Sequence, residues 1–412
     1  MANVSSSNGL EKYPKLRFPE FDEPYRKCRI GDIYAERGQR GAGDMELLSV
    51  TMNDGVMPRS EIEGKDNSSE DKSNYKVVCK DDMVYNSMRM WQGANGVSNY
   101  DGIVSPAYTV LMPIEEIDNR YFAALFKTSN LINEFRKNSQ GLTSDTWNLK
   151  YPQIRPIRLY IPSLREQHKI SAFIDALEER IGKQRQLVDA LKKYKRGVSN
   201  AIFSRKIRFK QKDGTEYPEW DTKQLSELME FKNGVNAQKD AFLKGNIKCI
   251  GVSDVYSGKP IYSCNIMGSI KLDSEQKREF LVEYGDVLFQ RSSETQEDIG
   301  HAAVYVDESQ MSVFNGFVIR GKKKAEYDPW FLHYELQTSD VRKQTIRLGA
   351  GAQHYNIGQE SLASIIVRLP STDEQNKIAH FLKSIDARIT VEESKIKTLQ
   401  MAKDGLMQKL FV

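Results

Sequence analysis

The chain has 412 residues, which exceeds one ordinary domain, and its 39% hydrophobic and 10% aromatic content is enough for more than one sizeable core. Its 60 basic residues nearly balance 56 acidic ones, so the net charge neither demands nucleic acid as a partner nor excludes a local basic face. No run of residues approaches the ~18 apolar positions of a membrane span, the first residues lack the apolar core of a signal peptide, and four scattered cysteines without a CxxC pair predict a reduced, cytoplasmic protein rather than a disulfide frame or a zinc site.

Residues 1–160 predict a first globular segment of mixed α+β type. Between its strand candidates lies a polar, glycine-punctuated loop, residues 86–96, which carries an arginine and a tryptophan. The apolar spacing of residues 119–137 favours a helix. The strand candidates are residues 45–51, 77–79, 82–85 and 102–111.

Residues 161–204 predict a long helix. Ser163-x-x-Glu166 has the form of a capping box, in which the hydroxyl and the carboxylate each bind a free backbone N–H of the first turn. A heptad seam follows, interrupted by Gln184 and Lys195. Its apolar members are Ile170, Ile174, Leu177, Ile181, Val188, Leu191, Val198 and Ile202.

Residues 205–368 predict a basic connector followed by a second globular segment. Residues 247–254 and 261–264 are strand candidates. Residues 283–293 parallel residues 82–89 of the first segment, and residues 313–320 parallel residues 102–111. Residues 330–337 correspond to the helix of the first segment. The opening of this segment, Tyr217–Trp220, likewise echoes Phe18–Phe21.

Residues 369–412 repeat the first long helix at a constant spacing of 208 residues, as from Pro162 to Pro370. Polar residues interrupt the second seam at the same two places, with Glu392 and Lys403. The spacing also relates Gly141 to Gly349 and Asn148 to Asn356, four residues whose role can simply be to build a turn. The apolar members of this seam are Ile378, Leu382, Ile385, Ile389, Ile396, Leu399, Leu406 and Leu410.

Each of the two long, narrow apolar seams needs a packing partner. The simplest arrangement is that the two helices pair with each other as a coiled coil. The alternative is an amphipathic surface helix packed on its own domain in each half. The fold class that we predict is α+β, with two pseudo-repeated globular domains, each followed by a long helix.

Motifs for chemistry are absent from the sequence. It contains no phosphate-binding loop, no dinucleotide fingerprint, no Asn/Asp-Pro-Pro-aromatic tetrapeptide and no G-x-S-x-G elbow that would make Ser292 or Ser293 a nucleophile. The five histidines are dispersed without ligand spacing, so no metal site is predicted. A nuclease using Asp286 and Glu294 is the enzymatic alternative, and it would require metal-dependent cleavage by the chain alone.

The whole chain resembles the specificity subunit of a type I restriction-modification system. The resemblance rests on the two P-S-x-x-E-Q heptad helices, on residues 48–55 and 88–93, on residues 285–292 and on the Gly349–Asn356 element. It implies two target recognition domains, each reading one half-site of a split, asymmetric DNA target, and an antiparallel coiled-coil spacer that docks two methyltransferase subunits. It also implies that the chain itself is not catalytic, that S-adenosylmethionine binds the methyltransferase subunits, and that restriction subunits join through them in phage defence.

The physical dimensions agree with that organisation. Helices of this length, at ~1.5 Å per residue, reach roughly 57 Å, and two heads on such a rod can face sites one DNA turn, ~34 Å, or more apart. Base readout needs paired donors and acceptors, chiefly arginine for guanine and asparagine or glutamine for adenine.

The candidates for base readout are polar or aromatic residues of the predicted loops. They are Arg89, Trp91, Gln92, Asn95 and Asn148 in the first segment, and Gln290, Arg291, Ser293, Gln353, His354 and Asn356 in the second. The candidates for phosphate contact, which positions without specifying, are Lys150, Arg155, Arg158, Lys206, Arg208 and Lys232. For each of them the competing interpretation is an ordinary solvated surface side chain.

A coiled-coil scaffold whose heads bind protein is the alternative to DNA recognition. Sequence-dependent DNA binding in the presence of methyltransferase subunits separates the two hypotheses.

Overall fold

The computed structural model describes residues 2–3, 13–41, 44–52, 55–66, 68–236, 245–351 and 354–412. The chain forms two compact units, one of residues 1–186 and 393–412 and the other of residues 187–392. Each unit therefore contains one globular domain, the beginning of one long helix and the end of the other. Among the described residues, no helix is long and apolar enough to cross a membrane.

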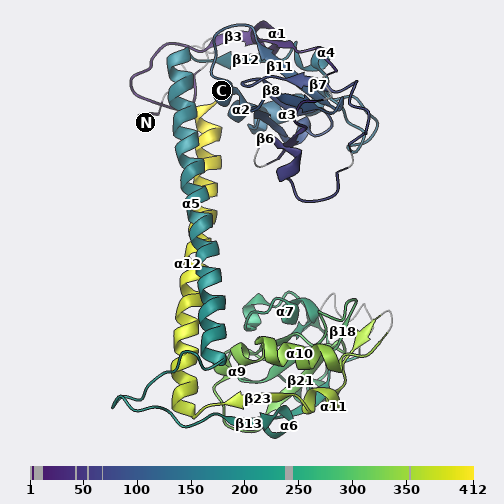
Figure 1. The fold of residues 1–412 in the computed structure, drawn as a ribbon, viewed down its shortest axis with the longest axis vertical. Coiled ribbons are helices and arrows are strands. Elements are labelled where there is room, and N and C mark those ends of the chain that lie inside the picture. The colour runs from purple at the N-terminus through teal and green to yellow at the C-terminus, as the bar shows by residue number, and fades with distance from the viewer. Residues whose placement is uncertain are drawn as a thin grey trace. The chain divides into compact units, whose positions relative to one another are not determined.

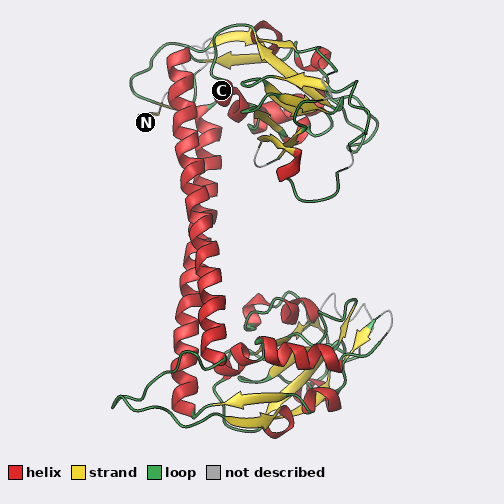
Figure 2. Ribbon diagram, viewed as in Figure 1, coloured by secondary structure: helices red, strands yellow, loops and turns green. Residues whose placement is uncertain are grey.

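The first globular domain is built on a four-stranded antiparallel sheet in the order β4-β11-β8-β9. Its apolar core includes the fully buried rings of Tyr34, Tyr85, Phe122 and Phe135. Figure 2 shows helices packed beside these strands. The sheet strands are β4 (Tyr34–Glu36), β8 (Met83–Asn86), β9 (Asn95–Val97) and β11 (Tyr108–Pro113). The helices are α1 (Ile30–Ile33), α2 (Asn119–Leu125), α3 (Ser129–Asn138) and α4 (Tyr151–Ile154), with 3₁₀ turns η1 (Arg59–Glu61) and η2 (Met90–Gln92).

Four strand pairs complete this unit. They are β1 (Ala2–Asn3) with β2 (Leu16–Arg17), β3 (Arg26–Arg29) with β12 (Arg158–Ile161), β5 (Leu48–Thr51) with β6 (Gly55–Pro58), and β7 (Lys76–Val78) with β10 (Gly102–Val104).

The second globular domain repeats this plan with a four-stranded sheet in the order β14-β21-β17-β19. Its sheet strands are β14 (Met229–Asn233), β17 (Val287–Gln290), β19 (Ala302–Val304) and β21 (Val318–Lys323). The remaining strands are β13 (Asp221–Gln224) with β23 (Ile366–Leu369), β16 (Ser269–Ile270) and β20 (Ser312–Phe314) on either side of β15 (Ile247–Ile250), and β18 (Ser292–Ser293) with β22 (Tyr355–Asn356). The helices are α6 (Leu225–Leu228), α7 (Val252–Tyr256), α8 (Ser274–Glu279), α9 (Pro329–Glu335), α10 (Ser339–Leu348) and α11 (Gln359–Ala363), with a 3₁₀ turn η4 (Ser263–Asn265).

The two long helices are α5 (Leu164–Phe203) and α12 (Thr372–Leu410), and within each unit they lie side by side (Figure 1). In the first unit the beginning of α5 accompanies the end of α12, and in the second unit the reverse holds, so the pairing is antiparallel. Every apolar seam residue predicted from the heptads is buried or partly buried. The α+β fold class with two long helices in contact is confirmed.

The three charged interruptions of the seams have ionic partners. Lys195 Nζ lies 2.7 Å from the Asp386 carboxylate, and Lys403 forms the equivalent ion pair with Glu178. Both pairs obey the spacing of 208 residues, since Lys195 corresponds to Lys403 and Glu178 to Asp386. Buried Glu392 is held by Arg388 one turn earlier, at 2.7 Å. These three breaks in the heptads are therefore paired charges rather than defects.

The glutamine of each P-S-x-x-E-Q motif joins a long helix to its globular domain. Gln167 accepts the backbone N–H of Asp118 through its side chain at 3.1 Å and donates to the Pro162 carbonyl at 3.0 Å. Gln375 makes the same two bonds, to Asp328 at 2.9 Å and to Pro370 at 2.8 Å. Asp118 and Asp328 are the N-caps of α2 and α9, so one amide fixes the starts of two helices.

The motif glutamates have partners different from those that a capping box predicts. Arg17 donates two hydrogen bonds to the Glu166 carboxylate, at 2.9 and 2.7 Å, in a pair that is almost fully buried. Trp220 Nε1 donates to Glu374 at 3.1 Å. Both carboxylates therefore bind the segment that opens each globular domain.

The ends of the long helices contribute to the domain cores. Phe411, just beyond α12, packs against Tyr121 of the first domain with ring centroids 5.2 Å apart. Phe203 at the end of α5 packs against Trp220 and Phe331 of the second domain. Each globular core is thus completed by a helix that begins in the other unit.

Several predicted elements differ from those found. Residues 102–111 form two strands because a turn separates β10 from β11. Residues 119–137 form two helices, since α2 ends at Leu125 with Phe126 as its C-cap and α3 begins after its N-cap residue, Thr128. Residues 247–254 continue from strand into helix α7, and residues 261–264 form a bridge and a 3₁₀ turn. The structural counterpart of Gly141 is Gly351 rather than Gly349, since both have positive φ, 141° and 149°. The segment boundaries at residues 160, 204 and 368 stay a prediction.

Candidate functional site

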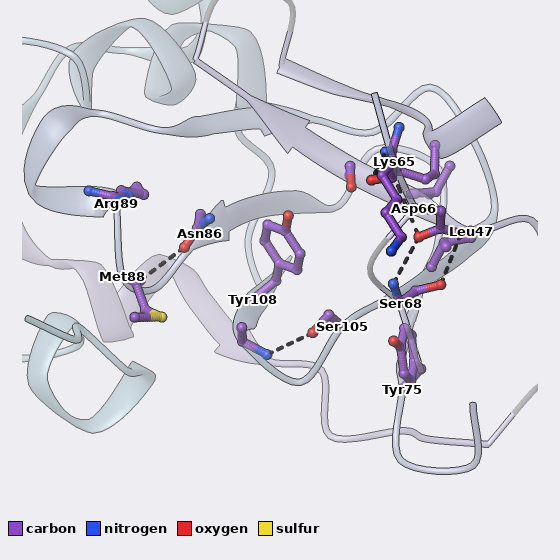
Figure 3. A pocket seen from close by; sticks show the side chains of 14 residues that line it. Leu47, Lys65, Asp66, Ser68, Tyr75, Asn86, Met88, Arg89, Ser105 and Tyr108 are labelled. Carbon is purple, nitrogen blue, oxygen red and sulfur yellow. Dashed lines mark hydrogen bonds and ion pairs between the residues drawn. The ribbon is translucent and has the colours of Figure 1, made fainter. Parts of the chain in front are cut away.

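The first globular domain has an open cleft of about 400 Å³ beside the end of β8. Figure 3 shows Asn86, Met88 and Arg89 on one side of it and Leu47, Lys65 and Asp66 on the other. Arg59, Lys65 and Arg89 outnumber the single carboxylate of Asp66, so the lining is basic. A donor-rich, positively charged cleft of this kind suits the acceptor atoms of a nucleic acid.

The second globular domain has a cleft of about 540 Å³ beside the end of β17. Carboxylates of Glu294 and Asp298 make this lining acidic, and the ring of Phe317 is 64% exposed. Acceptor groups suit the amino groups of bases better than they suit phosphate. The other lining residues are Val252, Tyr256, Gln290, Ser292, Ser293, His354 and Asn356.

The two clefts occupy equivalent places in the repeat. β8 and β17 have the same neighbours in their sheets, β11 with β9 and β21 with β19. Each strand is preceded by a buried aspartate that accepts the backbone N–H three residues earlier, Asp82 from Cys79 and Asp286 from Glu283. The repeat therefore presents two clefts of similar position and different lining.

The aspartate before each strand has a structural role. Asp286 is 1% exposed and also accepts the backbone N–H of Lys323 at 2.9 Å. Burial raises the pKa of its carboxyl, which the two backbone N–H groups partly offset. Among the described residues, no group of three or more His, Cys, Asp or Glu side chains has the arrangement of a metal site.

The base-readout candidates of the first domain lie in three different situations. Arg89 lines the cleft, and Trp91 and Gln92 follow it on η2. Trp91 stacks edge-on against Trp147, with centroids 5.2 Å apart. Asn148 forms a backbone bridge with Gln140 and is partly buried, which fits the turn-building interpretation.

The structure contradicts the prediction that Asn95 reads bases. This residue is 0% exposed, and its side-chain amide donates to the Gly93 carbonyl at 3.1 Å. The formation of β9 against β8 turns this side chain into the domain, and Asn95 is not among the residues that line the cleft, so we remove it from the base-readout set.

In the second domain Gln290, Ser293, His354 and Asn356 come together at the cleft. Ser292 and Asn356 are linked directly, since the serine hydroxyl donates to Asn356 Oδ1 at 2.6 Å. Arg291 is directed elsewhere: its guanidinium donates to the Gly316 carbonyl at 3.2 Å. Gln353 lies outside the described residues.

The phosphate candidates differ in their surroundings. Arg208 and Lys232 are in ion pairs, with Glu216 and Glu279 respectively. Lys150, Arg155, Arg158 and Lys206 are exposed. Lys150 and Arg155 flank α4, and Arg158 lies in β12. Figure 1 shows α4 and β12 on the side of the first domain away from β6.

Sequence reasoning missed several lining residues. Arg59 and Lys65 were overlooked because nothing in their local pattern distinguishes them from solvated surface residues. Asn86 was overlooked although the parallel between residues 82–89 and 283–293 places it at the position of Gln290. The alignment of the two halves could therefore have identified Asn86 as a candidate.

Comparisons with known proteins agree with this architecture. A family model described as the type I restriction modification DNA specificity domain matches residues 27–193 and again residues 217–401. The Type I restriction enzyme MjaVIII specificity subunit of Methanocaldococcus jannaschii is 23% identical over 349 residues, covering 82% of this chain and 80% of the relative.

Two solved structures share the fold. A chain from a structure of complex assembly and conformational transition in the type I R-M system has a TM-score of 0.59 at 15% identity, covering 94% of this chain and 97% of that one. The S subunit from M. genitalium has a TM-score of 0.53 at 16% identity, covering 97% and 99%. Since the family model matches both halves of the repeat, the chain belongs to the type I restriction-modification DNA specificity family and is the specificity subunit, the non-catalytic member, of such a system.

Proposed function

We propose that the clefts beside β8 and β17 read the two half-sites of a split, asymmetric DNA target. The observation that carries this proposal is the equivalence of the two clefts combined with their different linings, basic in one domain and acidic in the other. Equivalent position supports a common task, and different side chains support different sequences. We propose that the protein binds its DNA target in the cytoplasm.

We further propose that the α5–α12 pair docks two methyltransferase subunits and, through them, restriction subunits. The equivalent ion pairs Lys195–Asp386 and Lys403–Glu178 support this part, because they give the helix pair two similar surfaces. A pseudo-symmetric element of one chain suits two copies of one partner. S-adenosylmethionine binds the methyltransferase subunit, and this chain positions that chemistry on DNA.

Methylation mapping tests the proposal. The chain is expressed with its methyltransferase subunit, and the DNA is compared with that of a strain lacking the chain. We expect a split adenine-methylated motif only when the chain is present. A stable complex of the two proteins with no new motif would favour the scaffold alternative.

Two variants sharpen the test. Arg89→Ala is expected to relax the first half-site while leaving the second unchanged, because arginine at a base edge discriminates by about 1–3 kcal/mol. Arg155→Ala serves as the control: Arg155 is the C-cap of α4, which lies away from β6 in the first domain, so its loss should leave the selectivity for the first half-site unchanged. Equal behaviour of the two variants would contradict readout at the first cleft.

A further inference from the structure

The two clefts share a side-chain amide at one equivalent position. Asn86 is the last residue of β8 and pairs with Tyr108 of β11, and Gln290 is the last residue of β17 and pairs with Val318 of β21. Each lies four residues after the buried aspartate of its domain and lines the cleft of its domain. The repeat thus keeps the amide and changes only the length of its side chain.

Each amide is anchored to the backbone two residues further along the chain. Asn86 Oδ1 accepts the N–H of Met88 at 3.0 Å, a bond drawn in Figure 3. Gln290 Nε2 donates to the carbonyl of Ser292 at 2.9 Å. One amide is held by its acceptor and the other by its donor, and both anchors fix the orientation of the side chain.

The groups left over after anchoring are the same in kind. Asn86 keeps the Nδ2 donors and one lone pair of Oδ1, and no partner of Nδ2 lies within the described part of the chain. Gln290 keeps one N–H and its Oε1, which has no hydrogen-bond partner among the described residues although the residue is only 4% exposed. A buried carbonyl without a partner is unfavourable, so this atom suits an incoming donor.

One free donor beside one free acceptor is the set that reads adenine in the major groove. Asparagine or glutamine donates to N7 and accepts from the N6 amino group, whereas arginine pairs with the two acceptors of guanine. We infer that Asn86 and Gln290 are equivalent specificity-determining residues, each reading an adenine of its own half-site. This inference rests on the proposed function and names what the two clefts select.

The test uses the full chain in complex with its methyltransferase subunit. Asn86→Asp keeps the acceptor for Met88 and removes the donors, and Gln290→Met keeps the length and removes both groups. Asn99→Asp, at an exposed amide of the first domain outside the cleft, is the matched control. Formation of the complex on a sizing column confirms that each variant is folded.

The readouts are the methylated motif and the relative affinity of the complex for oligonucleotides in which each base pair of the target is replaced in turn. We expect Asn86→Asp to lower the preference for one A·T pair of the first half-site on the order of tenfold, since bidentate readout is worth roughly 5- to 150-fold. The second half-site should be unchanged. Gln290→Met should lower the preference for one A·T pair of the second half-site and leave the first half-site unchanged, so each variant is a control for the other.

An unchanged motif in both variants, or relaxation at a G·C pair, would overturn the inference while leaving the proposed function in place. Relaxation in both half-sites from a single variant would also overturn it, because each amide belongs to one domain. Absence of a split motif with the unaltered chain would overturn the inference and the proposed function together.

Discussion

The buried pair of Arg17 and Glu166 gives a sharp test of what holds the first unit together. Arg17→Met removes one partner and leaves the other charged, with side chains that are 2% and 1% exposed in the intact pair. Removing one partner of a buried pair costs about 3–5 kcal/mol, because the remaining charge is desolvated without compensation. For a unit of this size that corresponds to a fall in Tm of roughly 6–20 °C.

The matched control is Arg26→Met. Arg26 pairs with Glu115 at the surface, where its side chain is 56% exposed, and exposed pairs contribute about 0–1 kcal/mol. Thermal unfolding of both variants, followed by hydrogen exchange in the first unit, makes the comparison. The double variant Arg17→Met with Glu166→Leu should recover much of the loss, since two apolar side chains replace both charges. If the Tm of Arg17→Met falls no further than the Tm of Arg26→Met, the reasoning is refuted.

Replacing Leu177 and Ile385 together with Asp should break the helix pair and abolish binding of the methyltransferase subunit, because both occupy equivalent seam positions; unchanged co-elution would contradict the docking proposal. Lys195→Glu should destabilise the second unit by about 1 kcal/mol, with recovery when Asp386→Lys restores opposite charges, as a double-mutant cycle in urea would measure. Burial raises the pKa of the Glu335 carboxyl from its ordinary 4.5 to about 7. The folded state therefore holds a proton that the unfolded state releases between those values, and stability relative to Glu335→Gln should fall by about 3 kcal/mol as the pH rises through that window; parallel pH profiles of the two proteins would argue against it.

The long helices could be predicted because their pattern is long and is repeated without a gap. Each predicted seam residue lies in the buried or partly buried set. The partners of the polar seam positions could not be predicted, because Lys195 and Asp386 are 191 residues apart and meet only in the antiparallel register. A single sequence records that a charge is present and not which residue neutralises it.

The clefts were predictable in part for a related reason. The alignment of the two halves places Gln290 beside a functional loop, and the same alignment points to Asn86. It does not separate Asn86 from Asn95, since both are asparagines in one polar stretch. Their difference arises when β9 pairs with β8 and takes Asn95 to 0% exposure. Burial decided by strand pairing is a tertiary property that local composition does not carry.

The packing of Leu410 and Phe411 into the first globular core has a consequence for synthesis on the ribosome. Domains usually fold in the order in which they emerge, yet this core has to wait for residues that are translated more than two hundred positions later. The second globular core, which receives Phe203 from the preceding helix, has all its parts once the first half of α12, as far as Ile389, has appeared. The half of the protein made first is therefore the half finished last, and a premature stop codon a few residues before Leu410 would damage the amino-terminal domain rather than the domain next to it in the sequence.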